Sequence, residues 1–327
     1  MLRIIFTSLV LVTAVAVQAQ QLPLFSQYRE QTTLINPAII NADRAVLSFM
    51  PTSKAVVSYR NQWGKLGKEA PRTFTAQYEH ILEDANMTLG GAVTRDQTGP
   101  TSSVGVSLRY AYQIKFSNEG FLSLGLSTGF AQFRYLGHLG IFKDPGDDIG
   151  FTDNSRMLFE TNLGAYYQTE LNNYDIFYAG VSVPQGATAD LGGSGEASAD
   201  FRLRRVPHYY AQAGYYKYLG EGIGNRSIFI EPSVWLKTAQ NVPTQTDLNL
   251  RFQAADLFWI GGGMSFSVLD KFHRDNAHIE AGITVADDYF NSGRCIKIGV
   301  GYDTNITPYG SYLGSAFEIN LTYAWER

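Results

Sequence analysis

Large apolar residues alternate with small or polar residues throughout residues 104–116. The apolar positions are Val104, Val106, Leu108, Tyr110, Tyr112, Ile114 and Phe116. Strict alternation predicts a β-strand with one apolar face and one polar face. Strands of soluble sheets typically have about 5–6 residues, whereas a tilted strand that crosses a bilayer needs about 9–11. The pattern therefore predicts a strand that spans a membrane.

The same alternation recurs along the chain. In residues 121–133, Leu124 shares one face with Phe130, and Ser123 lies on the other face. Residues 313–325 alternate just as regularly. The expected strands comprise residues 44–62, 73–82, 87–96, 103–116, 120–133, 157–169, 174–184, 207–219, 226–237, 244–254, 257–268, 276–285, 294–303 and 313–325. The chain thus has about fourteen strand-like segments. They predict an all-β fold, namely a transmembrane antiparallel β-barrel.

The connections between the expected strands mostly alternate in length, although the inside turns at residues 220–225 and 286–293 are longer than the ideal. Residues 117–119 and 255–256 form short turns at one end, whereas the two longest loops, 134–156 and 185–206, lie at the other end. Bacterial barrels have an even number of strands, short periplasmic turns and longer outer loops. A soluble β-sandwich is the alternative fold, but the strand length and this parity favour a barrel that begins and ends on the periplasmic side.

The first residues have the layout of a secretory signal peptide. In residues 1–19, Arg3 supplies the positive charge, residues 4–17 are apolar, and Val17-Gln18-Ala19 fits a small-residue cleavage site. A helical membrane anchor is the alternative. The apolar core is shorter than the roughly 20 residues that a spanning helix needs, so we expect a cleaved signal peptide and export.

Residues 20–43 precede the first expected strand and are too apolar for a solvated tail. Pro23, Phe25 and Tyr28 lie in this segment. We expect it to enter the barrel lumen as a plug-like segment or to lie along the periplasmic rim. Residues 44–327 then form a single barrel domain.

Composition agrees with a membrane barrel. Only 17% of the residues are charged, against about 25% in soluble domains, and the mean hydropathy is −0.13. An apolar outer face and a polar inner face together give such a near-neutral value. The net charge of −4 offers no basic surface for nucleic acid. Cys295 is the one cysteine, so an intrachain disulfide is excluded.

The sequence offers little catalytic or metal-binding chemistry. One interpretation of His273 and His278 is a pair of metal ligands, but zinc sites normally have a fuller set of ligands. Asp144, Asp147 and Asp148 offer oxygen ligands for calcium, but their spacing is not that of an EF-hand loop. Solvated loop residues are the favoured interpretation in both cases. We therefore expect a protein that is not an enzyme and needs no cofactor.

Charged residues on the polar phase of the strands are the candidate functional residues. Those expected to face the lumen are Arg109, Lys115, Arg251, Glu280, Lys297 and Glu318. They either brace a packed interior or line a water-filled path that selects solutes. Several aromatic residues suit the girdles at the membrane interfaces: Tyr110, Tyr112, Tyr209, Tyr210, Tyr215, Tyr216, Tyr323 and Trp325.

Several short motifs, in order, are similar to the PorP/SprF family of outer-membrane proteins linked to the Bacteroidetes type IX secretion system. They include the set Pro23, Phe25, Gln27 and Tyr28, then Asn36-Pro37-Ala38, Tyr59-Arg60-Asn61-Gln62-Trp63, Tyr110-Ala111-Tyr112, Val206-Pro207-His208-Tyr209-Tyr210, Ala213-Gly214-Tyr215, Pro232-Ser233, Asp247-Leu248-Asn249, Gly301-Tyr302-Asp303 and Glu318. The resemblance spans nearly the whole mature chain.

The resemblance implies an accessory role in secretion or gliding. Family members are paired with large surface adhesins or with periplasmic components of the machinery, and they support export or surface retention of a client. The implied partner-binding or lumen residues are Pro23, Phe25, Tyr28, Asn36, Pro37, Arg60 and Trp63, together with the lumen charges above. Within this set, we expect Arg60 to brace the lumen and Trp63 to anchor the membrane interface. The alternatives are a passive porin or small-solute transporter and, more remotely, a barrel enzyme.

Overall fold

The computed structural model describes the chain from residue 25 to residue 326 with short gaps. The described residues are 25–40, 46–47, 49–116, 120–137, 153–172, 174–194, 205–222, 225–268, 272–286, 293–308 and 310–326. The expected signal peptide, Pro23 and the group Asp144, Asp147 and Asp148 lie outside these residues.

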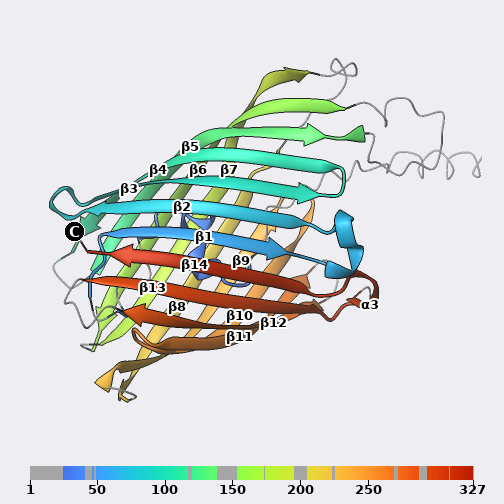
Figure 1. Ribbon diagram of the computed structural model, residues 1–327. Helices are drawn as coiled ribbons and strands as arrows, with labels where there is room; N and C mark the ends of the chain where they lie inside the picture. The colour runs from blue at the N-terminus through green and yellow to red at the C-terminus, as the bar shows by residue number, and fades with distance from the viewer. Residues whose placement is uncertain are drawn as a thin grey trace, which may run out of the picture.

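Fourteen antiparallel strands close into a barrel (Figure 1). Each strand pairs with its sequence neighbours, and the first pairs with the last from Ser53↔Trp325 to Asn61↔Phe317. The strands are β1 Ser53–Asn61, β2 Arg72–Leu82, β3 Met87–Thr98, β4 Thr101–Lys115, β5 Gly120–Tyr135, β6 Asn154–Leu171, β7 Asp175–Ser194, β8 His208–Glu221, β9 Ser227–Ala239, β10 Val242–Ala254, β11 Phe258–Val268, β12 Phe272–Ala286, β13 Arg294–Asn305 and β14 Ala316–Trp325. The predicted all-β barrel is confirmed.

The helices are short. They are η1 Tyr28–Glu30, α2 Thr32–Ile35, η3 Gly64–Glu69, η4 Glu83–Ala85 and α3 Gly310–Leu313. None of the helices among the described residues has the length and apolar character needed to cross a membrane.

The two faces of the sheet follow the predicted alternation. In β4, Leu108 is 69% exposed, whereas the neighbouring Arg109 is 2% exposed. In β14, Leu321 is exposed and Glu318 is fully buried. Apolar side chains therefore cover the outside of the barrel, and polar side chains fill the inside. Because exposed apolar bands of this kind are stable only against an apolar phase, the outer face suits lipid.

The two ends of the barrel differ. The end at which β1 begins is here called the turn mouth, because short connections join the strands there, as between β10 and β11. The opposite end is called the loop mouth. It carries the two longest connections, between β5 and β6 and between β7 and β8. It also carries η3 and α3 (Figure 1). These two helices touch through a hydrogen bond from Lys65 Nζ to the Ser311 carbonyl at 2.8 Å.

Several strand boundaries differ from the predicted ones. The largest difference is in β7, which extends to Ser194 instead of residue 184, so residues 185–194 of the predicted outer loop are strand. The first strand begins at Ser53 instead of residue 44, because Val46 packs inside the turn mouth and Pro51 has no backbone N–H to donate to a ladder. The last strand begins at Ala316 instead of residue 313, because α3 extends to Leu313.

Two of the predicted girdle residues point the wrong way. Tyr210 is 7% exposed and Tyr216 is 2% exposed, so both lie inside the barrel instead of at its lipid face. Tyr209, which precedes Tyr210 and lies on the opposite face, is 52% exposed as expected. Consecutive tyrosines in a strand necessarily face opposite sides, so a Tyr-Tyr pair cannot place both rings in one girdle.

A charge placed in the middle of the outer face tests the lipid contact. We predict that Leu108→Arg lowers the free energy of unfolding in lipid vesicles by about 2–4 kcal/mol, the cost of arginine near the bilayer midplane. Urea unfolding followed by tryptophan fluorescence measures it. Tyr312→Arg is the matched control: this residue is 77% exposed on α3, outside the strands, and should change stability little. Equal effects of the two substitutions would contradict a lipid-facing β4.

Candidate functional site: the chain segment inside the lumen

A stretch of chain lies inside the barrel and is here called the lumen segment, residues 25–40. All of its residues are buried except the half-buried Leu34. It contains η1 and α2, and its helical part stops at Asn36, whose backbone is extended (φ −149°, ψ 112°). Pro37 explains this stop, because the residue before a proline disfavours the helical conformation.

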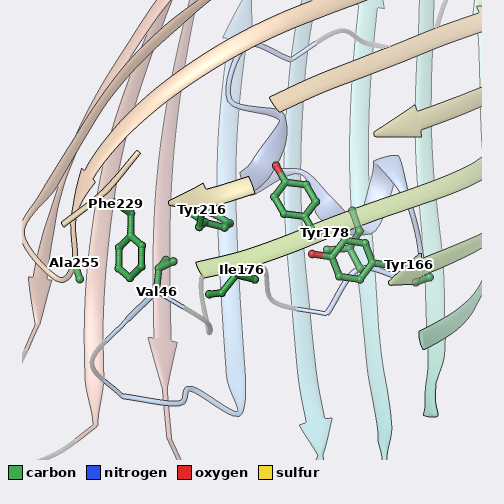
Figure 2. Close-up of a cluster of buried hydrophobic side chains, with 9 residues drawn as sticks. Val46, Tyr166, Ile176, Tyr178, Tyr216, Phe229 and Ala255 are labelled. Atoms are coloured by element: carbon green, nitrogen blue, oxygen red, sulfur yellow. The ribbon is translucent and has the colours of Figure 1, made fainter. Parts of the chain in front are cut away.

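The lumen segment runs along the length of the barrel. Ser26 lies beside Arg60, the last residue but one of β1, near the loop mouth. Ile39 and Val46 instead belong to an apolar cluster with Ile176, at the start of β7 and thus at the turn mouth. Figure 2 shows Val46, which precedes β1, near Ile176 in this buried cluster. The chain therefore passes from the loop mouth to the turn mouth before β1 begins.

A first ionic cluster holds the segment near the loop mouth. The Arg60 guanidinium contacts Asp303 and donates a hydrogen bond to Glu318 at 3.0 Å. Ser26 donates its backbone N–H to Glu318 at 2.9 Å and its hydroxyl to Asp303 at 2.7 Å. All four residues are buried. Buried charges are stable only when paired and hydrogen-bonded, so Ser26 completes the coordination of both carboxylates.

A second ionic cluster surrounds Arg29. Its Nε donates to Glu231 at 2.8 Å, its Nη2 donates to Ser233 at 2.7 Å, and its Nη1 lies 3.3 Å from Glu280. The Tyr178 hydroxyl also donates to Glu231, at 2.6 Å. The guanidinium fork therefore joins the lumen segment to β9 and β12 at once.

Glu30 forms a third cluster on another part of the wall. Lys297 Nζ donates to one carboxylate oxygen at 2.8 Å, and Lys54 Nζ lies 3.3 Å from the other. The Thr322 hydroxyl donates to the second oxygen at 3.3 Å. Consecutive residues of opposite charge thus reach different walls, since Arg29 binds β9 and β12 whereas Glu30 binds β1, β13 and β14.

Gln31 adds a neutral anchor. Its side-chain oxygen accepts hydrogen bonds from Thr75 at 3.0 Å and from Gln77 at 2.6 Å, both on β2. Its amide nitrogen donates to Asn320 on β14 at 3.2 Å. A fully buried amide with both ends satisfied fixes the rotation of the segment as well as its position.

Arg109 holds the backbone of the segment. Its Nε donates to the Pro37 carbonyl at 2.7 Å, and its guanidinium also contacts the Ile39 carbonyl. Nη1 donates to Glu79 on β2 at 2.6 Å and lies 3.3 Å from the Thr33 hydroxyl. Because the contacts to Pro37 and Ile39 are to backbone oxygens, they position the segment whatever its side chains are.

Glycines in the wall make room for the segment. The Asn36 amide nitrogen donates to the carbonyls of Ala165 and Val181, at 3.2 Å each, so Asn36 lies directly on β6 and β7. A Cβ at Gly164 would overlap the Asn36 side-chain oxygen, and a Cβ at Gly125 would overlap the backbone at Pro37. Only residues without a side chain allow this approach.

Aromatic rings support the end of the segment near the loop mouth. Tyr28 stacks on Trp235 with 5.1 Å between ring centroids, and Tyr210 meets the same indole edge-on at 5.4 Å. Phe25 joins this buried cluster. Lys237 Nζ lies 4.3 Å from the indole centroid on the same strand. The inward position of Tyr210 is explained by this packing.

The structure brings most of the sequence-predicted site residues together, but not Trp63 or Lys115. Most belong to the lumen segment or touch it: Phe25, Tyr28, Asn36, Pro37, Arg60, Arg109, Glu280, Lys297 and Glu318. Arg251 is buried in the wall with its guanidinium 4.8 Å from the Trp259 ring centroid. Trp63 follows β1 at the loop mouth, half-buried and with a left-handed backbone (φ 57°).

Lys115 does not join the buried network. It lies on the inward phase of β4, as predicted, but it is the last residue of the strand and is exposed at the turn mouth. The alternation predicts on which face of the sheet a residue lies, but not how far it lies from the end of the barrel. It therefore predicts the same lumen position for Lys115 as for Arg109.

The sequence reading does not single out the charged residues of the lumen segment or several of their partners. These are Arg29, Glu30, Lys54, Glu79 and Glu231, while Asp303 enters only within the motif Gly301-Tyr302-Asp303. Each wall residue among them occupies the polar phase of its strand, which is the signal that could have found it. Arg29 and Glu30 carry a different signal, because they are adjacent and are the only charged residues among residues 25–40.

The described residues hold one serine–histidine contact, from Ser53 Oγ to His80 Nδ1 at 2.8 Å on the outer phase of β1 and β2. Within them, no group of three or more His, Cys, Asp or Glu side chains is placed to hold a metal ion. Residues 125–129 read Gly-Leu-Ser-Thr-Gly, the spacing of a nucleophile elbow, but they lie inside β5. An elbow instead exposes its serine at a sharp turn from strand to helix, whereas Ser127 is 1% exposed in the wall.

Comparison with known proteins gives one family and several remote structures. Residues 17–323 match the family described as "Type IX secretion system membrane protein PorP/SprF". No curated protein matches the chain.

Three solved structures illustrate the structural comparison. The P. putida toluene transporter TodX is 8% identical, with 90% of this chain and 94% of that chain covered and a TM-score of 0.49. A Pseudomonas aeruginosa FadL homologue is 9% identical, with 90% and 94% covered and a TM-score of 0.48. CdiB from Acinetobacter baumannii is 10% identical with a TM-score of 0.44. The match covers 84% of this chain but spans only 60% of the CdiB chain.

Removal of Arg109 tests how firmly the lumen segment is held. We predict that Arg109→Ala lowers the free energy of unfolding by about 3–5 kcal/mol, because it leaves Glu79 buried without a counter-charge. Arg109→Met combined with Glu79→Leu should recover part of this loss. Denaturant titration in lipid vesicles measures both. Lys115→Ala, on the same strand and phase, is the control and should have little effect; a loss as large as that of Arg109→Ala would argue against the network.

Proposed function

Because the chain belongs to the PorP/SprF family of type IX secretion system membrane proteins, we propose that it is an outer-membrane subunit of the secretion or gliding machinery. In this role it binds a large secreted surface protein or a periplasmic component of the machinery. It thereby supports export or surface retention of the client. It catalyses no reaction in this role.

The fold supports an outer-membrane location. The closed ladder joins every strand to two neighbours, with β7 continuing past its last pair with β8, Ser182↔Tyr210, and the outer face is apolar. With this location, the turn mouth faces the periplasm and the loop mouth faces the cell surface, since bacterial barrels carry their longer loops outside. The client would then approach at the loop mouth, and machinery components at the turn mouth.

The occupied lumen is the observation that carries the accessory role. A passive porin or small-solute transporter needs an open path between the two mouths. Here the lumen segment contacts β1, β2, β4, β7, β9, β12, β13 and β14. A barrel filled in this way suits a protein that binds partners at its rims.

The residues that resemble the family motifs then have two tasks. Phe25, Tyr28 and Asn36 hold the lumen segment, so they act on partners only through its position. Trp63 lies at the loop mouth beside η3 and is available at the rim, either as an anchor in the membrane interface or as a partner contact.

Deletion of the gene tests the proposed function. We predict that the surface amount of at least one large secreted protein falls strongly, while its synthesis and the general outer-membrane protein pattern stay unchanged. Quantitative proteomics of surface and periplasmic fractions measures this, with complementation as the control. Wild-type surface levels of every secreted adhesin in the deletion strain would refute the proposal.

Arg60 links the lumen segment to the proposed function. We predict that Arg60→Ala reduces client export while heat-modifiable migration shows that the barrel still forms, because Asp303 and Glu318 lose their shared cation. Lys65→Ala, at the same mouth but exposed, is the control. Unaltered export by a folded Arg60→Ala protein would contradict a role for this cluster.

A further inference from the structure

We infer that the barrel has a second, latent activity: with the lumen segment displaced, its wall conducts hydrated ions and small polar solutes. This inference goes beyond the proposed accessory function. It rests on the way in which the segment and the wall are built, and it assigns the lumen segment the role of a removable stopper.

The wall is complete without the lumen segment. Every strand pairs with both neighbours around the closed sheet, and the segment adds no strand to it. The hydrogen bonds between segment and wall use wall side chains, except those from Asn36 to the carbonyls of Ala165 and Val181. Loss of the segment therefore leaves the backbone ladder of the barrel intact, and the ladder is what keeps a barrel stable in lipid.

The segment now shields the inner wall from solvent. Inner-wall residues on opposite sides are almost fully buried although they line a hollow barrel, among them Thr75, Ser127, Glu231 and Glu318. Small barrels of about 8 strands are filled by their own side chains, whereas barrels of about 16–18 strands leave an aqueous channel. A barrel of fourteen strands lies between these cases, and here a separate piece of chain supplies the filling.

The wall beneath the segment is suited to water. Displacing the segment would expose the carboxylates of Glu231 and Glu280 on one side and the ammonium groups of Lys54 and Lys297 on the other. All four face Arg29 or Glu30 and could be hydrated instead. Because both signs of charge line the path, the conducted ions would include cations and anions, with weak selectivity.

The contacts of the segment favour exchange with water. Most of them are ion pairs and hydrogen bonds, and water can replace such partners at modest net cost. The remaining contacts are two apolar clusters, around Trp235 and around Ile176. A segment held mainly by polar contacts is separable from its wall in a way that an apolar core is not.

A reversible lock distinguishes a stopper from a permanent filling. A Cβ at Gly164 would overlap the Asn36 side-chain oxygen, but Asn36→Cys removes that oxygen. The Cβ position of Gly164 lies 3.0 Å from Asn36 Cγ, so Asn36→Cys with Gly164→Cys brings two sulfurs within bonding reach. Cys295→Ser removes the buried native thiol from the experiment. Arg29→Ala with Glu30→Ala loosens the segment without any change in the wall.

We predict that the loosened, lockable protein gains a steady conductance in planar bilayers when reduced and loses it when oxidised. The unmodified protein should conduct little. Silence of the reduced protein, when heat-modifiable migration shows that it is folded, would overturn the inference. Equal conductance in the oxidised and reduced states would overturn it as well, because the segment would not control the path.

A second measurement applies if the loosened protein does not fold. In the lockable protein with Arg29 and Glu30 intact, urea added below the unfolding midpoint should open a reversible conductance when the thiols are reduced, and not when they are oxidised. Opening in both states, or in neither, would overturn the inference. The proposed accessory role is tested separately, by client export in cells. Neither conductance result bears on that test, so failure of this inference and failure of the accessory role remain distinguishable.

Discussion

Closure of the backbone ladder is the constraint on which the rest of the structure depends. In lipid no water is available to the amides and carbonyls of a strand edge, so the sheet must bond its last strand to its first. The pairing of β1 with β14 meets this requirement over the full length of β1. Closure fixes which face of each strand meets lipid and which meets the lumen. The alternation of apolar and polar residues in the sequence is the consequence.

Closure also encloses polar and charged side chains, and the lumen segment provides partners for them. Every strand places charged or polar side chains on its inner face, and a closed barrel encloses them. Buried charges are costly unless each has a partner, and a pair broken on one side is worse than no pair. Arg29 and Glu30 bring one charge of each sign to walls of the opposite sign. The segment thus fills the lumen and balances its charges together, which is why its sequence mixes apolar and charged residues.

Much of the fold could be predicted from the sequence, because a repeat of two is a local signal that recurs in each strand. The errors lie where apolar residues have another use, as in Val46 at the turn mouth and Tyr210 beside Trp235. Much less of the site could be predicted. Ser26 and Asp303 are 277 residues apart, and no local pattern indicates that they meet. The alternation identified Arg109, Glu280 and Glu318 as inward-facing, but their partners follow only from barrel closure and from the path of the lumen segment.

Solvent accessibility along β4 tests the central claim, a lipid-facing barrel with an occupied lumen, most directly. Single spin labels at residues 108–114 in lipid vesicles report contact with oxygen, which dissolves in lipid, and with a water-soluble nickel complex. The account predicts high oxygen contact at positions 108, 110, 112 and 114, and protection from both reagents at positions 109, 111 and 113. Strong contact of the odd positions with the nickel complex would show a water-filled lumen. Loss of the alternation altogether would contradict the barrel itself.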